Sequence, residues 1–276
     1  MPAEFLTLFW PACVFSVTLM LLVWWLALRL NNLGIVDIAW SYAFAPVAIF
    51  YGLAAHGDGL RRGLVAGMVA LWSLRLGTHV FLRVVKHHPQ EDRRYSEMRA
   101  HWQKHFRWQV LLFFEIQAGL IAILSVPFLI AAINPRPGIS AWEGVGMALW
   151  CVALAGESLA DWQLKQFLGR AENRGRICRA GLWNYSRHPN YFFEWLVWVA
   201  FFLFALGSPL GCCTIYCPAL MLYFLVRVTG IPLTEKLSVR NRGAAYVEYQ
   251  RTTSAFVPWF KKGNRVPEPE NPATHL

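Results

Sequence analysis

Seven long apolar runs dominate the sequence. They occupy residues 5–30, 33–55, 63–85, 108–133, 140–167, 189–206 and 212–231. Each has about the 20 residues that an α-helix needs to cross the roughly 30 Å hydrocarbon core of a membrane. A helix also pairs its backbone N–H and C=O groups within the segment, which lipid demands because it offers no hydrogen bonds. The pattern predicts an all-α fold: a polytopic integral membrane helical bundle with about seven transmembrane helices.

Charge is concentrated between these runs. Only 15 % of the residues are charged and the net charge is +10, which taken alone would suggest a nucleic-acid partner. Most of the Lys and Arg residues instead follow the third, fifth and seventh runs, so no nucleic-acid partner is expected. With seven spans these segments lie on one side, and the excess of positive charge predicts that this side is cytoplasmic. The sequence therefore predicts a multi-pass membrane protein with a cytoplasmic C-terminus.

A single membrane-embedded domain is expected over residues 1–260. Its last part, residues 233–260, is polar with spaced aromatic residues and is expected to fold back on the cytoplasmic side. Residues 261–276 are rich in Pro, Glu and Asn, a composition typical of a disordered tail. The oligomeric state stays open.

Polar residues inside apolar runs are costly and by default indicate a functional site. Asp37, Glu115 and Gln117 lie near the predicted cytoplasmic ends of the second and fourth runs and are candidate catalytic residues; Trp40 is a candidate substrate contact. A desolvated carboxyl such as that of Glu115 can stay protonated and donate a proton. The alternative for Asp37 is a helix cap.

The most informative stretch is residues 181–194, Gly-Leu-Trp-Asn-Tyr-Ser-Arg-His-Pro-Asn-Tyr-Phe-Phe-Glu. Pro189 suits the first position of a helix. In a helix that starts there, Asn190 and Glu194 share one face. Tyr185, Arg187 and His188 precede it, where helix N-termini favour anions. The alternative, a basic loop that anchors the chain at the membrane surface, leaves Asn190 and Glu194 unexplained.

Several common site motifs are missing. The sequence has no Gly-x-Gly-x-x-Gly, no P-loop, no His-Glu-x-x-His and no Gly-x-Ser-x-Gly. A nucleotide would therefore be held by loops and helix ends, where arginine forks bind phosphates. The cysteines form no Cys-x-x-Cys pair, and no metal site is expected.

Residues 181–198 resemble the signature of the membrane steroid 5-alpha-reductase-like family, in its bacterial branch labelled DUF1295. Weaker pieces of the same resemblance are residues 36–40, residues 91–95, Gln117 and Glu235 with Lys236, so that it covers residues 31–260. The resemblance implies an enzyme that uses NADPH to reduce a C=C bond in a hydrophobic, steroid-like or enone lipid.

The same resemblance implies the positions of the cofactor contacts. Asp161, Arg176, Asn190 and Glu194 fall on cofactor-contacting positions, Tyr185, Arg187 and His188 belong to the same motif, and Arg93, Arg94 and Tyr95 are expected phosphate or adenosine contacts. The animal enzymes grip the substrate carbonyl with an early Gln-Glu pair and a late Tyr. This chain has no such pair in its first two runs, so Asp37, Glu115 and Gln117 are expected to replace it.

A second resemblance points to a methyltransferase. Residues 187–191, Arg-His-Pro-Asn-Tyr, are similar to the Arg-His-Pro-x-Tyr turn of membrane isoprenylcysteine and phospholipid methyltransferases, and Glu235, Tyr246, Tyr249 and Pro258 echo their tail. That resemblance implies S-adenosylmethionine as the cofactor and a lipid or prenyl thiol as the acceptor. The many arginines of residues 168–188 favour the phosphate-bearing NADPH instead. A non-enzymatic scaffold or a transporter is the third alternative, although no internal repeat of the transporter kind is visible.

Overall fold

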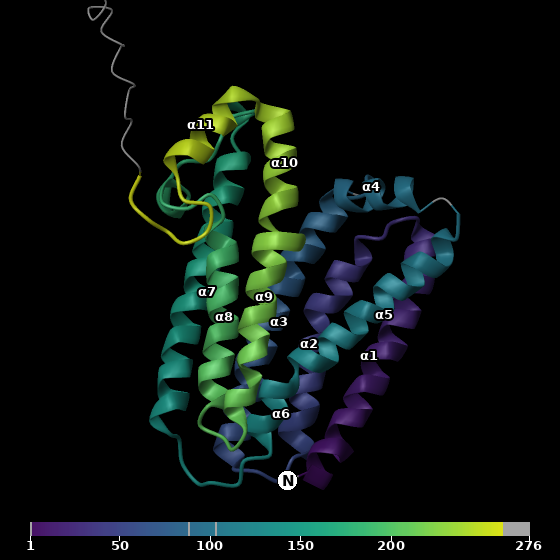
Figure 1. Cartoon of the computed structure of the whole chain (residues 1–276), viewed down its shortest axis with the longest axis vertical. Coiled ribbons are helices and arrows are strands. Elements are labelled where there is room, and N and C mark those ends of the chain that lie inside the picture. Colours follow the sequence, from purple (N-terminus) through teal and green to yellow (C-terminus); the bar gives the residue numbers. More distant parts are fainter. Residues whose placement is uncertain (1, 88, 103, 262–276) are drawn as a thin grey trace, which may run out of the picture. The chain divides into compact units, whose positions relative to one another are not determined.

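The computed structural model describes residues 2–87, 89–102 and 104–261, and these form helices joined by loops (Figure 1). The described residues contain no strand, only one isolated bridge between Ser186 and Ser254. The predicted all-α fold is therefore confirmed. The predicted disordered tail lies, from residue 262 onwards, outside the described residues.

Among the described residues, five helices are long and apolar enough to cross a membrane: Ala3–Leu30, Ile35–Ala54, Gly59–Lys86, Phe106–Ala132 and Gly211–Arg242. They coincide with five of the seven predicted runs. The sixth run is the shorter apolar helix α8 (Pro189–Ala205). The fifth run is α7 (Ala141–Leu168), which is not among the five. A multi-pass helical membrane protein follows, while the count of seven spans and their orientation stay predictions.

The chain divides into two compact units. Unit 1 comprises Met1–Cys151 and Val197–Ala219, and unit 2 comprises Val152–Leu196 and Leu220–Leu276. The boundaries fall inside α7, α8 and α9 (Tyr216–Tyr223). The expectation of one domain over residues 1–260 stays a prediction, and each unit is described by itself below.

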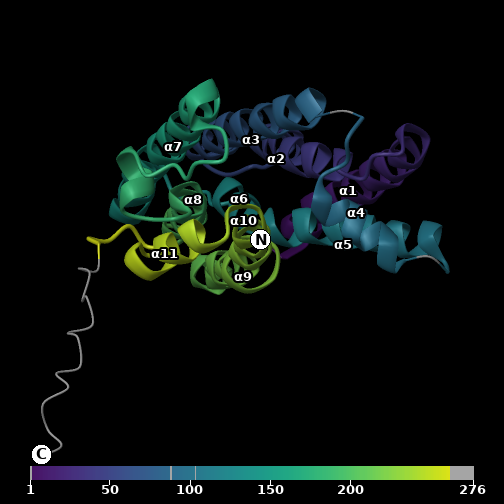
Figure 2. The same cartoon turned by 90° about the horizontal axis from the view of Figure 1, so that it is seen from above.

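Unit 1 is built on two helix pairs. Here α2 (Ile35–Ala54) packs along α3 (Gly59–His87), and α1 (Pro2–Leu30) packs on α5 (Phe106–Leu124) (Figure 2). The short helix α6 (Val126–Ala132) contacts both α2 and α3. The core of unit 1 is aromatic. It contains the fully buried rings of Phe44, Trp72, Phe128, Trp198 and Phe201, which contact one another at centroid distances of 4.9–6.4 Å. Most of these pairs are edge-to-face, the geometry that ring quadrupoles favour.

A buried ion pair fastens one end of unit 1. Arg61, in the first turn of α3, is 2 % exposed, and Glu143 of α7 is fully buried. The Nε atom of Arg61 donates to Glu143, while its other nitrogens donate to the carbonyls of Asn134 (3.1 Å), Arg136 (2.6 Å) and Gly138 (2.6 Å). Arg61 lies between the second and third predicted apolar runs, but these acceptors hold it in the packed interior, where a cation needs full hydrogen bonding.

Unit 2 contains the end of α7, the turns η1 (Ala171–Asn173) and η2 (Gly181–Asn184), and the start of α8. It also contains the π-helical turn η4 (Phe224–Val228) and the helices α10 (Ile231–Arg242) and α11 (Ala244–Thr252) (Figure 1). The seventh predicted run, residues 212–231, stops directly before Pro232. In the structure, η4 and Gly230 interrupt the regular ladder and Pro232 lies in the first turn of α10, where its missing N–H is tolerated. Pro232 therefore opens a helix.

The Arg61–Glu143 pair yields a stability prediction. Replacing Arg61 with Met leaves the Glu143 carboxylate buried without its cation, which we expect to lower the free energy of unfolding by about 3–5 kcal/mol. The double variant Arg61→Met with Glu143→Leu removes both charges and should recover much of that loss. The unfolding midpoint in detergent measures both, and a double variant less stable than the single one would contradict the assignment.

Candidate functional site

The residues expected from the sequence to form the site fall into two groups, one in each unit. Unit 2 holds Asp161, Arg176, Tyr185, Arg187, His188, Asn190 and Glu194, and unit 1 holds Asp37, Trp40, Arg93, Arg94, Tyr95, Glu115 and Gln117.

In unit 2, a tight turn leads from η2 into α8. Gly181 has φ +57°, and a Cβ there would lie 2.2 Å from Nε2 of Gln163, so only glycine fits. The backbone N–H of Leu182 donates to Oε1 of the same Gln163 (2.9 Å), which ties the turn to α7. The hydroxyl of Ser186 accepts from the N–H of His188 (3.1 Å). The helix then starts at Pro189, which confirms the predicted start.

The carboxylate of Glu235, in α10, is the hub of this unit. Its Oε1 accepts from Nε of Arg187 (2.6 Å) and lies 3.2 Å from Nε2 of His188, and its Oε2 accepts from Nε2 of Gln250 (2.8 Å). Arg187 also donates through Nη1 to the carbonyls of Gln250 (2.9 Å) and Thr253. We call these four side chains, Arg187, His188, Glu235 and Gln250, the Glu235 clamp.

The clamp brings the C-terminal segment back onto the turn. Residues 253–260, here named the strap, run beside residues 185–187. The N–H of Arg187 donates to the carbonyl of Ser254 (2.9 Å), and the N–H of Trp259 donates to the carbonyl of Tyr185 (2.9 Å). The hydroxyl of Ser186 donates to the carbonyl of Phe256 (2.8 Å). Residues 253–260 therefore lie against residues 185–187 within unit 2, while the fold-back of residues 233–260 on the cytoplasmic side stays a prediction.

An amide and two carboxyl groups gather in the first turns of α8 and at the end of α7. Asn190 is half-buried and its Nδ2 donates to Oδ1 of Asp161 (3.2 Å). Asp161 and Glu194 are buried, at 9 % and 7 % exposure. Beside them the ring of Tyr191 stacks on His188 at 5.3 Å and 7°. Such a set can bind a ligand that both donates and accepts hydrogen bonds.

Two expected residues of unit 2 lie at its surface. Arg176 is exposed in the loop between η1 and η2, next to Gly175 with φ +74°. Tyr185 is 41 % exposed, and its ring meets that of Phe260 edge to face at 6.2 Å. The strongly engaged residues of the motif are therefore Arg187 and His188, and the accessible ones are Arg176 and Tyr185.

In unit 1, the carboxylate of Asp37 contacts one hydroxyl group and two guanidinium groups. The hydroxyl of Tyr95 donates to Oδ1 (2.6 Å), Nη2 of Arg94 donates to Oδ2 (2.8 Å), and Nη2 of Arg83 lies 3.7 Å from Oδ2. Burial, reinforced by the charge of Asp37, raises the pKa of Tyr95 well above its usual range. Gly34 is the N-cap of α2 and no side chain caps that helix, so the capping alternative for Asp37 is wrong.

The short helix α4 (Arg93–His101) is held against the start of α2 by two further carboxylates. Asp92 caps α4 by accepting from the N–H of Arg94 (3.0 Å) and also binds its guanidinium. Burial alone would raise the pKa of Asp92, but the hydrogen bonds and charge of Arg94 outweigh it and lower the pKa. Glu91 accepts from the N–H of Leu33 (2.7 Å) and pairs with Arg99 (3.0 Å).

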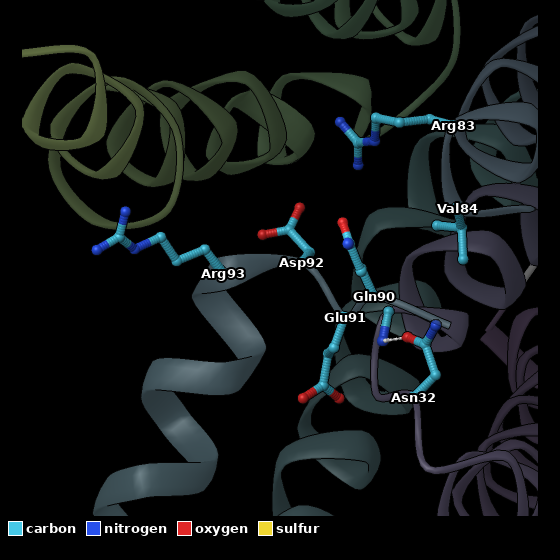
Figure 3. Close-up of a pocket in the computed structure, with 8 residues that line it drawn as sticks. Asn32, Arg83, Val84, Gln90, Glu91, Asp92 and Arg93 are labelled. Carbon is cyan, nitrogen blue, oxygen red and sulfur yellow. Dashed lines mark hydrogen bonds between the residues drawn. The ribbon is translucent and has the colours of Figure 1, made fainter. Parts of the chain in front are cut away.

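A pocket of about 270 Å³ opens where α2, α3 and α4 meet. Figure 3 shows the side chains of Arg83, Gln90 and Asp92 directed toward one another, with Arg93 on the far side of Asp92. Asn32 closes the pocket and its Oδ1 accepts from the N–H of Gly34 (2.9 Å). The lining carries charges of both signs.

Trp40 and Glu115 each leave one buried polar atom without a hydrogen bond. These are Nε1 of Trp40, on α2, and Oε1 of Glu115, on α5, and neither finds a partner among the described residues. The two helices contact each other within unit 1. Gln117 is half-buried. Unpaired buried polar atoms are costly and call for an explanation such as a ligand contact.

Sequence reasoning missed several members of these networks. It gave no role to Gln250, and it treated Asp92 and Glu235 only as parts of a resemblance. Asp92 carried a local signal, since Asp directly before a helical segment is a typical N-cap. Gln250 carried none, because its role depends on the return of the chain to Glu235.

Comparisons with known proteins confirm the DUF1295 part of the sequence resemblance. The family model described as "Protein of unknown function (DUF1295)" matches residues 23–253. "Uncharacterized protein C594.04c" of Schizosaccharomyces pombe is 26 % identical over 211 residues, which cover 66 % of this chain and 60 % of that relative. The chain thus spans about three-fifths of the length of that relative. No solved structure matches the chain.

The Glu235 clamp yields a second prediction. In Glu235→Gln the buried cation Arg187 loses its counter-charge, so we expect the strap to detach more often and its amides to exchange hydrogen at least tenfold faster. Hydrogen–deuterium exchange of residues 253–260 measures this. The matched control is Glu248→Gln in α11, an exposed residue paired with Arg251, which should leave the strap unchanged. Equal effects of the two variants would contradict the role of Glu235.

Proposed function

The chain belongs to the DUF1295 family, and from this premise we propose that it is a membrane-bound, steroid 5-alpha-reductase-like enzyme. It would use NADPH to reduce a C=C bond in a hydrophobic, steroid-like or enone lipid. The observation that supports this most is that half-buried Asn190 lies with the buried carboxyl groups of Asp161 and Glu194, in the same unit as the exposed arginines of the η1–η2 loop.

The residues of unit 2 fit the chemistry of a nicotinamide. Its carboxamide carries an N–H₂ donor and a carbonyl acceptor, and the Asn190 amide with the Asp161 and Glu194 carboxyls offers the complementary groups. Burial of these groups strengthens each hydrogen bond, because the local dielectric is low. In this proposal Asn190, Asp161 and Glu194 hold the nicotinamide end.

The phosphates and rings of the cofactor need different partners. Arg174, Arg176 and Arg179 are exposed between η1 and η2, and guanidinium forks bind phosphates bidentately. The exposed ring of Tyr185 offers a stacking surface. Arg187 and His188 are already bound to Glu235, so we assign them to positioning the turn. Contacts of Arg93, Arg94 and Tyr95 with the cofactor stay predictions.

Within unit 1, the unpaired polar atoms of Trp40 and Glu115 suit a carbonyl-bearing acceptor. When bound, NADPH supplies a hydride to the β-carbon of a conjugated alkene, and a proton added at the α-carbon completes the reduction. Trp40 is assigned to hydrogen-bonding the acceptor, and Glu115 and Gln117 to holding its carbonyl or delivering the proton. Asp37 was expected to be catalytic, but its carboxylate oxygens already accept hydrogen bonds from Tyr95 and Arg94. We therefore propose that Asp37 orients Tyr95.

One observation favours the methyltransferase as a second candidate. Glu235 and Tyr249, two members of its tail pattern, contact the turn that carries the Arg-His-Pro-x-Tyr sequence: Glu235 binds Arg187, and the hydroxyl of Tyr249 donates to the carbonyl of Trp183. In that case the cofactor would be S-adenosylmethionine and the acceptor a lipid or prenyl thiol.

Cofactor binding separates the two candidates. We expect NADPH to raise the unfolding midpoint of the purified protein in detergent, by a stabilisation of about 2.7 kcal/mol at a concentration 100 times its Kd, and S-adenosylmethionine to leave it unchanged. Asn190→Ala and Glu194→Gln should abolish the shift, whereas the control Glu172→Gln, exposed in η1, should retain it. A shift with S-adenosylmethionine alone would select the methyltransferase.

A turnover assay with an added acceptor tests the proposed reaction. Addition of a hydrophobic enone to the protein with NADPH should consume the cofactor, as followed by its absorbance. Glu115→Gln keeps the shape of the side chain and removes its proton chemistry, so we expect kcat to fall by about 10²–10⁴ with NADPH binding intact. Glu97→Gln, exposed on α4, serves as the control. Full activity of Glu115→Gln would exclude Glu115 as the proton donor.

A further inference from the structure

A second pocket, of about 350 Å³, opens along the strap of unit 2. It is lined among others by Arg187, Arg251, Thr253, Val257, Trp259 and Phe260. Asp161, Asn190 and Glu194, the residues assigned to the nicotinamide, do not line it. We call it the strap pocket.

The strap pocket has a polar floor with unused hydrogen-bonding capacity. Arg187 is 91 % buried; its Nε and Nη1 are engaged, and its Nη2 makes no hydrogen bond with the described residues. Thr253 is only 4 % exposed and its Oγ1 has no hydrogen-bond partner among them either. The buried hydroxyl of Thr253 is costly to leave unpaired unless a ligand completes it, and Nη2 of Arg187 is a charged donor beside it. A guanidinium beside a hydroxyl suits the oxygens of an anion.

The charges around the pocket leave room for one anion. Glu235 neutralises Arg187 from its Nε side, and Glu248 pairs with Arg251 at the rim. Because a guanidinium has five donors in a planar fork, Arg187 can bind a second anion through Nη2 while it keeps Glu235. Lys261, directly after the strap, is exposed and adds a further positive charge. A single negative charge is therefore favoured over several.

The rim of the pocket is apolar and exposed. Val257, Trp259 and Phe260 are 48 %, 68 % and 77 % exposed. In a chain with five helices able to cross a membrane, Trp and Phe beside basic residues are typical of the membrane–water interface. A free phosphate matches only the floor, whereas a phospholipid matches both the floor and the rim.

We propose that the strap pocket binds an anionic phospholipid. Its phosphate lies on Arg187 and Thr253, and its acyl chains lie along Val257, Trp259 and Phe260. The lipid would attach the strap to the membrane surface next to the turn that leads into α8. This inference does not depend on which reaction the protein catalyses.

The test uses the full-length protein in a neutral detergent with three probes: short-chain phosphatidylglycerol, phosphatidylcholine of the same chain length, and inorganic phosphate. Phosphatidylglycerol should raise the unfolding midpoint most, with an advantage over phosphatidylcholine that shrinks as salt is added. Equal effects of the two lipids would overturn recognition of the anion. An effect of inorganic phosphate as large as that of phosphatidylglycerol would overturn the lipid as the occupant.

Variants locate the effect in the pocket. Thr253→Val keeps the side-chain shape and should weaken phosphatidylglycerol binding about tenfold, because a hydrogen bond to a charged group is lost. Thr252→Val is the matched control, since its hydroxyl donates to the carbonyl of Glu248 and does not line the pocket. Trp259→Ala changes only the exposed rim and should weaken both lipids. Unchanged phosphatidylglycerol affinity in Thr253→Val and Trp259→Ala would place the lipid elsewhere and overturn the proposal.

Discussion

The carboxylate of Glu235 is the constraint on which unit 2 depends. It binds a guanidinium, an imidazole and an amide that come from two segments, residues 187–188 and residue 250. A buried charge is tolerated only when it is paired and fully hydrogen-bonded, so the geometry of these segments is strongly restricted. With Arg187 held by Glu235 and by two carbonyls, the start of α8 and the strap have few alternative arrangements. The position of Asn190, three residues beyond Arg187, follows from that restriction.

Unit 1 uses the same kind of contact at the start of α2. Asp37 binds Arg94 and Tyr95, and Asp92 binds Arg94 a second time, so a helix composed largely of polar residues is held in place by carboxylates. In both units, arginines of a segment that looks solvent-exposed in the sequence are paired with carboxylates: Arg187 with Glu235, and Arg94 with Asp37 and Asp92. The net charge of +10 is therefore a poor guide to which arginines can meet a ligand. The available ones are those in loops, such as Arg176.

The features that the sequence predicted well are local ones. Apolar runs define the helices because burial in lipid depends on composition over about 20 residues. Pro189 defines the start of α8 because its ring acts on its own turn. The misses involve partners far along the chain. Arg61, for example, is buried because Glu143 and three carbonyls more than 70 residues away receive it. A single sequence carries no signal for pairings of this range.

The hydrogen bonds that Arg187 already makes restrict where a ligand can bind in unit 2. A phosphate placed on the Nε edge of Arg187 would compete with Glu235 at 2.6 Å, and the loss of that pair would release the strap as well. A ligand that uses the free Nη2 edge leaves the clamp intact. In the proposed function, the exposed loop arginines would therefore bind the cofactor phosphates, and Asn190, Asp161 and Glu194 would hold the nicotinamide. Accessible cations for the phosphates, and amide and carboxyl groups for the neutral nicotinamide ring, are the two kinds of partner that such a dinucleotide would need.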